Sequence, residues 1–216
     1  MELSEAIRER RSIRAYKNTP IPRDVIEEVL RLAINAPSSN NLQPWEFVIV
    51  KDEEKDRLSR KLIKAYKEKK ISCGSGAVKP LPQAIRRRGT QTLRSMKQYV
   101  ERTGVSIDSF VNEGSCNFYG APVAIIICLD DCFSARQMVD VGTVVGYMVL
   151  AAHAFGLATC PIGLIAEYGD EVKELLNIPD TKTVIIGLAL GYPDRENPVG
   201  QFRSSRVEPN ALIRWI

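Results

Sequence analysis

The 216-residue chain lacks the features that mark several classes of protein. It has a single histidine, and its five cysteines form no C-x-x-C pair, so neither a metal site nor a disulfide framework is expected. Its N-terminus has neither the basic start nor the apolar run of a secretory signal. It contains no internal repeat and no low-complexity tract. These absences favour one globular domain over residues 1–216, in a reducing cytoplasm.

A strong charge of one sign is also missing. Thirty Lys and Arg residues against 26 Asp and Glu residues leave a formal net charge of +4, far from the dense basic stripes of a nucleic-acid-binding protein. The basic run at residues 64–70 is typical of a solvated helix face. Only Arg86-Arg87-Arg88 keeps a nucleic-acid partner open, and such binding would weaken steeply with salt. Small molecules are therefore the expected ligands, and no nucleic acid.

One stretch without formally charged residues, 141–166, is long enough to suggest a membrane span. Gly156 and Pro161 divide it into a helical half that ends near Phe155 and a short extended piece. The helical half is shorter than the ~20 apolar residues that a bilayer-spanning helix requires. We therefore expect a buried helix and no membrane partner.

Hydrophobic periodicity predicts more helices than strands, and hence the α+β class. Helices are expected from Ser4 to the basic cluster at 10–14, and at 25–34, 58–66, 83–102, 140–155 and 169–176. Strands are expected at 47–50, 123–129, 159–162 and 183–190. Residues 71–82 contain two glycines and two prolines, which predicts a loop that covers a site or is mobile.

The helix expected at 140–155 is apolar nearly all round, and five of its residues are Gly or Ala. Such a helix must be covered on every side, in a small protein often by a second subunit. Its His153 is expected to be a satisfied core or interface residue without a catalytic role. The apolar end of the chain, Leu212, Ile213 and Trp215, is expected to dock on its own subunit or on a partner. The helix in particular predicts a homodimer.

The main chemical signal is the cluster Arg10-Arg11-Ser12-Ile13-Arg14, at the end of the first helix. Guanidinium groups bind phosphate through paired charge-assisted hydrogen bonds, and this cluster offers more donors than a helix end requires. By itself it is also compatible with basic residues that stabilise a helix dipole. The chain has no Walker loop and no G-x-G-x-x-G after a strand, so side chains would have to hold a bound nucleotide.

Four motifs in series resemble the nitroreductase family of FMN enzymes, in order and spacing as well as in residue type. They are Arg10-Arg11-Ser12-Ile13-Arg14-Ala15-Tyr16, Ala36-Pro37-Ser38-Ser39-Asn40-Asn41-Leu42-Gln43-Pro44-Trp45-Glu46-Phe47, Gly156-Leu157-Ala158-Thr159-Cys160-Pro161-Ile162-Gly163 and Leu190-Gly191-Tyr192-Pro193. The resemblance covers residues 1–60 and 117–216. It implies a three-layer fold, in which helices flank a central, mostly antiparallel sheet and a long central helix lies at a dimer interface.

The resemblance implies that FMN is held by side chains from several segments. Arg10 would lie near the phosphate and ribityl chain, and Arg14 near the N1/O2 edge of the flavin, where a cation raises the reduction potential. Short polar groups of the second motif would bind the ribityl chain and pyrimidine ring, usually from the other subunit. One or both of Arg203 and Arg206 would complete the phosphate site. The implied cofactor-binding residues are Arg10, Arg11, Ser12, Arg14, Ser38, Ser39, Asn41, Gln43, Pro161, Ile162, Gly163, Arg203 and Arg206.

The implied chemistry belongs to the cofactor. The segment Pro161-Ile162-Gly163 would lie along one flavin face, with backbone N–H groups near N5, and no catalytic side chain is expected. The expected function is an FMN-dependent oxidoreductase that takes hydride from NADH or NADPH and reduces a nitroaromatic, quinone or similar electron-poor acceptor in ping-pong fashion. The alternatives are a non-catalytic FMN-binding or sensing module, and a family variant with other flavin chemistry, such as reductive dehalogenation or flavin fragmentation.

Residues 71–117 depart from the family pattern, because the Asn and Lys that some members place near the flavin ring are not found there. This variable segment usually shapes the substrate pocket or its lid. The charge of Arg86-Arg87-Arg88 favours an acidic substrate or the extra phosphate of NADPH, or belongs to a solvated face. The physiological acceptor and the choice between NADH and NADPH stay open.

Overall fold

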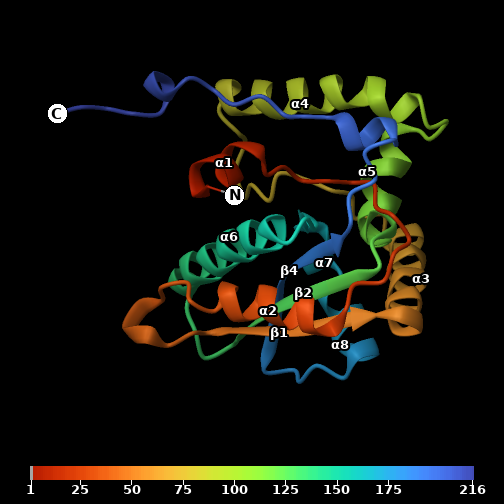
Figure 1. Cartoon of the computed structure of the whole chain (residues 1–216), viewed down its shortest axis with the longest axis vertical. Helices are drawn as coiled ribbons and strands as arrows, with labels where there is room; N and C mark the ends of the chain where they lie inside the picture. The colour runs from red at the N-terminus through yellow and green to blue at the C-terminus, as the bar shows by residue number, and fades with distance from the viewer. Residues whose placement is uncertain (1) are drawn as a thin grey trace.

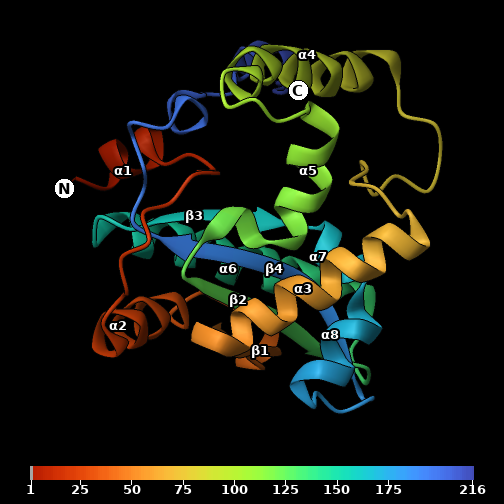
Figure 2. The ribbon, with the colours of Figure 1, turned by 90° about the vertical axis from the view of Figure 1, so that its right-hand side faces the viewer.

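The computed structural model describes residues 2–216 and is built around one four-stranded sheet (Figures 1 and 2). The strands are β1 (Trp45–Lys51), β2 (Val123–Asp130), β3 (Ala158–Ile162) and β4 (Lys182–Gly191). Their order is β1-β2-β4-β3, and each neighbouring pair is antiparallel. The first seven residues of β2 are apolar and buried because both faces of the sheet are covered there.

Helices cover both faces of the sheet, which gives three layers. On one face, α2 (Arg23–Ala33) and α6 (Met138–Ala154) pack against each other and against the sheet in one apolar core cluster. On the other face, α3 (Asp52–Lys69), α7 (Leu164–Glu167) and α8 (Gly169–Leu176) form a second cluster. This arrangement confirms the predicted α+β class and the antiparallel sheet.

Three helices stand outside these layers. α1 (Leu3–Glu9) leads into the arginine cluster, and α5 (Ile107–Cys116) follows α4 (Gln83–Glu101). In both views the chain after η4 lies along α4 (Figures 1 and 2), where Met96, Val100, Val199 and Phe202 form a small separate core. Short 3-10 turns complete the chain: η1 (Ser39–Asn41), η2 (Phe118–Gly120), η3 (Ala135–Gln137), η4 (Pro198–Gln201) and η5 (Pro209–Ala211).

The predicted helices and strands are confirmed, with ends that shift by a few residues. The structure adds α5 and α7, which the sequence did not indicate. α1 begins at Leu3 instead of at Ser4, and no side chain caps it. Residues 70–82 contain no helix or strand, in line with the predicted loop. Nowhere in residues 2–216 is a helix long and apolar enough to cross a membrane.

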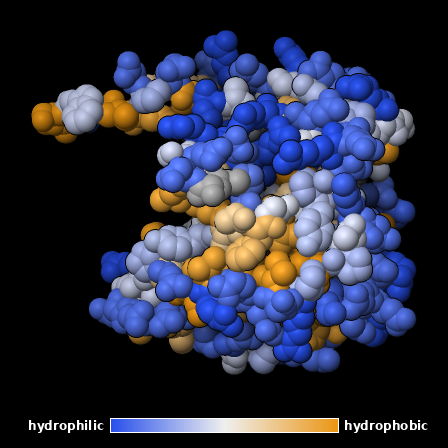
Figure 3. Space-filling view, in the orientation of Figure 1, coloured by the Kyte–Doolittle hydropathy of each residue, from blue (hydrophilic) through white to orange (hydrophobic). Residues whose placement is uncertain are grey.

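The C-terminal segment does not dock on its own subunit, so that alternative is wrong. Leu212 is 67% exposed, Ile213 50% and Trp215 90%. Figure 1 shows the segment projecting from the body, and Figure 3 shows apolar side chains at its tip. Docking on a partner stays a prediction.

Candidate functional site

The predicted arginine cluster is an extended segment that runs beside strand β3. Helix α1 ends at Glu9, and the chain leaves the helical conformation at Arg10. The Ile13 N–H donates to the Thr159 carbonyl at 3.0 Å, and Ser12 forms a parallel bridge with Thr159. The backbone is therefore fixed against the sheet edge, and its side chains alternate between two sides.

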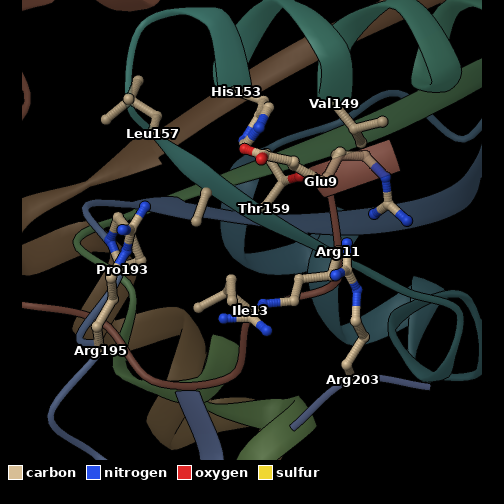
Figure 4. Close-up of a pocket in the computed structure, with 13 residues that line it drawn as sticks. Glu9, Arg11, Ile13, Val149, His153, Leu157, Thr159, Pro193, Arg195 and Arg203 are labelled. Carbon is tan, nitrogen blue, oxygen red and sulfur yellow. The ribbon is translucent and has the colours of Figure 1, made fainter. Parts of the chain in front are cut away.

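A cavity of about 300 Å³ opens between this segment, the end of α6 and the chain that follows β4 (Figure 4). Figure 4 shows Arg11 and Arg203 on one side of the cavity and Arg195 on the opposite side. His153, from α6, and Glu9 lie near each other at another edge. The cavity thus brings together three of the predicted arginines, Arg10, Arg11 and Arg203.

Glu9 is a carboxylate that lines this cavity, but among the described residues it forms no ion pair with the arginines. In residues 2–216 the ion pairs of arginine all lie elsewhere, on exposed helix surfaces. Burial, and then the charges of Arg203 and Arg195, lower the pKa of Arg11. Burial and the charge of Arg206 likewise lower the pKa of Arg10. Like charges held together without a counter-ion favour the binding of an anion.

Two buried polar atoms of the cavity have no hydrogen-bond partner within residues 2–216: Nε2 of His153 and Oγ1 of Thr159. Burial lowers the pKa of His153; the carboxylate of Glu9 opposes this shift, and the charges of Arg10 and Arg195 add to it. An unpaired buried polar atom costs roughly 1–3 kcal/mol, so a ligand that supplies partners fits here. The prediction of a satisfied core histidine is wrong, and the interface alternative stays a prediction.

Arg195 and His153 were not among the predicted binding residues. Arg195 comes two residues after the motif Leu190-Gly191-Tyr192-Pro193, and this nearness is a signal that could have found it. His153 carried no such signal, because a histidine on an apolar helix does not reveal which neighbours it faces.

Arg14 does not line the cavity; it lies among aromatic side chains. Its Cζ is 5.6 Å from the centroid of the Tyr119 ring, and its Nη1 is 3.5 Å from the Ser12 carbonyl oxygen. Nearby, the Tyr16 hydroxyl donates to the Ile13 carbonyl at 2.7 Å. The guanidinium of Arg14 is half-buried and forms no ion pair among the described residues, so most of its donors are free for a ligand.

The predicted segment 161–163 forms the end of β3 and the turn into α7. Ile162 is buried in the second core cluster, whereas Pro161 is half-buried and Gly163 is exposed. Because β3 is an edge strand, the backbone here is held by the core and still reaches the surface. Burial raises the pKa of the neighbouring Cys160 thiol, which makes it a poor nucleophile at neutral pH.

The predicted loop 38–43 is tight, and three of its residues are left-handed, with φ between 47° and 57°. The Ser38 hydroxyl accepts the Gln43 N–H at 3.0 Å, and the Ser39 N–H lies 3.3 Å from both carboxylate oxygens of Asp140. Within residues 2–216 no hydrogen bond joins this loop to the arginine segment. The loop carries the predicted residues Ser38, Ser39, Asn41 and Gln43.

The two C-terminal arginines take different places. Arg203 donates to the Arg8 carbonyl and lines the cavity. Arg206 donates to the Ser204 hydroxyl at 2.8 Å, within its own segment, and only its charge reaches Arg10. Of the two, Arg203 is therefore the one that lines the cavity.

These features define an α+β protein with a cationic cavity at the edge of its sheet. The cavity offers guanidinium groups that form no ion pair among the described residues, and two polar atoms without hydrogen-bond partners there; Arg14 offers a further cation along the same segment. The model of the nitroreductase family matches residues 7–192. The chain belongs to the nitroreductase family.

Its relatives act on nitroaromatic compounds, by their names. The 4-nitrobenzoate reductase of Nocardioides sp. (strain LMS-CY) is 27% identical over 218 residues, which cover 97% of this chain and 88% of the relative. Nitroreductase NfnB of Mycolicibacterium smegmatis is 29% identical over 212 residues, 97% of this chain and 90% of the relative.

Solved structures agree with this assignment. The FMN and NADPH-dependent nitroreductase NfnB from sphigopyxis sp. strain HMH superposes with a TM-score of 0.89 at 26% identity, over 100% of this chain and 99% of that chain. The FMN-dependent NfnB from Mycobacterium smegmatis in complex with NADPH gives the same TM-score and identity over 100% of both chains. The predicted three-layer fold is confirmed.

Proposed function

We propose that the protein is an FMN-dependent oxidoreductase that takes hydride from NADH or NADPH and reduces a nitroaromatic, quinone or similar electron-poor acceptor. One observation carries the proposal: the extended segment 10–14, fixed to β3, directs guanidinium groups without counter-ions to two neighbouring places. One place is the cavity of about 300 Å³, and the other is beside the end of β3. The family and the named cofactors of its solved members support this choice.

The cavity suits the phosphate end of FMN. Arg10, Arg11 and Arg203 supply forked donors that bind phosphate oxygens in pairs, and Arg195 adds a further charge. The buried hydroxyl of Thr159 would gain the partner that it lacks. With the phosphate held here, Ser12 and residues 161–163, which lie along and at the end of β3, would hold the rest of the cofactor.

FMN, when bound, accepts hydride at N5 and passes two electrons to an acceptor. Arg14 would hold the pyrimidine edge, and the backbone of residues 161–163 would lie along one face of the ring. The side chains thus orient the cofactor and place charge against it, and none acts as a general acid or base. Donor and acceptor would meet the same exposed ring in turn, which is a ping-pong order.

A homodimer completes the proposed site, with loop 38–43 of the second subunit forming the opposite wall. Exposed apolar side chains mark the surface that such a partner would cover, and Figure 3 shows apolar side chains gathered over α6. They are Leu3 at 67%, Ile7 at 57%, Val139 at 72% and Tyr147 at 43% exposed, together with the C-terminal Leu212, Ile213 and Trp215.

Residues 71–117 would shape the acceptor pocket. The start of this segment is anchored, because the Cys73 N–H donates to the buried Asn112 side chain at 2.7 Å and the Tyr168 hydroxyl donates to the Ile71 carbonyl at 2.7 Å. The rest of the loop is exposed and can differ between relatives without disturbing the sheet. All five cysteines are free thiols, which supports a place in the reducing cytoplasm.

The proposal is tested by loading the purified chain with FMN and measuring steady-state turnover with NADH and with NADPH against a panel of nitroaromatics and quinones. We expect turnover with at least one nicotinamide and parallel reciprocal plots, as a ping-pong order requires. FMN that binds but stays oxidised under anaerobic nicotinamide would mean a binding or sensing module. A chain that takes up no FMN would contradict the proposal.

A further inference from the structure

Arg14 is a half-buried cation that no carboxylate holds in place. Its guanidinium lies 3.5 Å from the Ser12 carbonyl oxygen, and the Tyr119 hydroxyl is within reach of the same group. A long, flexible side chain with free donors does not hold one direction unless something packs against it. The group that packs against this guanidinium is the ring of Tyr119, with its centroid 5.6 Å from Cζ.

The backbone around Tyr119 is itself unusual. Phe118, Tyr119 and Gly120 are all left-handed, with φ of 50°, 54° and 75°. Two consecutive non-glycine residues in this region are unfavourable and persist only where the surroundings fix them. The fully buried Phe118, in the second core cluster, supplies that fixing, and the result is a turn between α5 and β2 that aims the next side chain, Tyr119, at Arg14.

The ring of Tyr119 is also held from three other sides. Its hydroxyl lies 2.9 Å from the Ser115 hydroxyl, and the Phe110 ring lies 5.3 Å away, centroid to centroid. A Cβ at Gly114 would stand 3.1 Å from two atoms of the Tyr119 ring, so glycine at this position leaves the ring its space. The side chain therefore has one fixed orientation, and its face is available to a cation.

We propose that Tyr119 is a positioning residue: its ring face holds the Arg14 guanidinium toward the pyrimidine edge of FMN and thereby raises the reduction potential of the bound cofactor. This inference rests on the proposed function. A cation fixed at that edge binds reduced FMN, which carries the extra negative charge, more tightly than oxidised FMN. A guanidinium that moves away from this edge no longer favours the binding of reduced FMN over oxidised FMN.

The test compares the midpoint potential of bound FMN in the wild type, Tyr119→Phe and Tyr119→Leu, by anaerobic spectroelectrochemistry. Tyr119→Phe keeps the ring, so we expect a potential close to that of the wild type. In Tyr119→Leu we expect reduced FMN to bind about tenfold more weakly relative to oxidised FMN, which corresponds to a potential lower by about 30 mV. Phe133→Leu is the matched control, since it removes an aromatic ring that packs against the core cluster on the other face of the sheet from Phe118.

A second series of variants tests the same proposal even if the Tyr119→Leu protein does not fold. Fluorinated phenylalanines at position 119 keep the ring volume and withdraw negative charge from its face, so the potential is expected to fall as fluorines are added. Equal potentials across this series, or an equal fall in Phe133→Leu and Tyr119→Leu, would overturn the role of Tyr119. If the wild type bound no FMN at all, the proposed function would fall with it, and that result is distinct from bound FMN whose potential ignores position 119.

Discussion

At the scale of single residues, the site differs from the rest of the surface in the partners of its charges. On the exposed face of α2, Arg23 pairs with Glu27 at 2.7 Å, an arrangement that contributes little to stability. In the cavity, Arg10 and Arg11 lie near other arginines and pair with no carboxylate of the described residues. Charges kept together without counter-ions are costly in the empty protein and favour an anionic ligand.

Replacing the cavity arginines should weaken FMN binding. Each charge-assisted hydrogen bond to phosphate is worth about 1.5–3 kcal/mol, so Arg10→Ala and Arg203→Ala should each raise the Kd for FMN by roughly 10- to 100-fold. Quenching of FMN fluorescence during titration of the apoprotein measures this change. Arg23→Ala is the control and should bind FMN as the wild type does. Unchanged affinity for FMN in both cavity variants would show that the phosphate does not bind in this cavity.

His153 should make the apoprotein sensitive to acid. Burial lowers its pKa below the unfolded value of 6.5, with Arg10 and Arg195 adding to the shift and Glu9 opposing it. As the pH falls below that value, the unfolded chain takes up a proton that the folded chain resists, so the free energy of unfolding decreases. Between pH of about 7.5 and about 5.5, the Tm of His153→Gln should therefore fall less than the Tm of the wild type. Parallel curves of Tm against pH for the two proteins would contradict the lowered pKa of His153.

At the scale of elements, hydrophobic periodicity predicted the helices and strands that carry an apolar stripe or a continuous apolar run. β2 and α6 were predicted because nearly every residue of theirs is apolar, and α8 because its apolar residues repeat at helical spacing. α5 was missed although Ile107, Phe110 and Val111 repeat at helical spacing, because this stripe spans little more than one turn and is followed by polar and small residues. Its buried asparagine is bonded to the loop at Cys73, a contact that no local pattern predicts.

The candidate site was predictable only in part, for a similar reason. The resemblance of the motifs pointed to Arg10, Arg11 and Arg203, and the structure brings these three to one cavity. Arg195 and His153 reach the same cavity through the path of the chain after β4 and the rotation of α6 about its axis. Both depend on packing between elements distant in sequence, which a motif does not contain.

Close packing at the centre of the sheet gives a prediction at this scale. A Cβ at Gly187, on β4, would stand 2.7 Å from Cγ1 of Ile165 and 3.1 Å from Cε1 of Phe118. Gly187→Ala should therefore lower the free energy of unfolding by about 1–3 kcal/mol, measured by urea denaturation. Gly89→Ala, in open space on α4, is the control and should be neutral or stabilising by up to about 1 kcal/mol. A Gly187→Ala variant as stable as the wild type would contradict this prediction and show that the neighbouring side chains can move to accommodate a Cβ.

At the scale of the whole molecule, the chain buries a two-sided core and leaves one apolar surface open. α6 is covered on its sheet side, yet Val139 stays 72% exposed and Tyr147 43%. The C-terminal segment, which projects at the α4 end of the molecule, has its own apolar side chains exposed (Figures 1 and 3). Such a surface is typical of an association site, and in the proposal loop 38–43 of a second copy would complete the cofactor site.

Disrupting this surface should therefore prevent dimerisation and weaken the binding of FMN. Val139→Glu places a carboxylate in the first turn of α6, which the helix dipole tolerates, while the apolar interface does not. We expect sedimentation velocity to show a monomer that folds but binds FMN at least tenfold more weakly. Val78→Glu, on the exposed loop before α4, should remain a dimer with bound FMN. A wild type that sediments as a monomer with FMN bound would refute the shared site.

The central claim, that this chain carries FMN and cycles it between a nicotinamide and an electron-poor acceptor, is tested most directly by one anaerobic measurement. The FMN-loaded protein is mixed with NADPH or NADH in a stopped-flow instrument while its visible absorbance is followed, and 4-nitrobenzoate is then added. We predict that the flavin absorbance disappears with the nicotinamide and returns with the acceptor, in stoichiometric amounts. A colourless protein, or a flavin that stays oxidised with both nicotinamides, would contradict the claim.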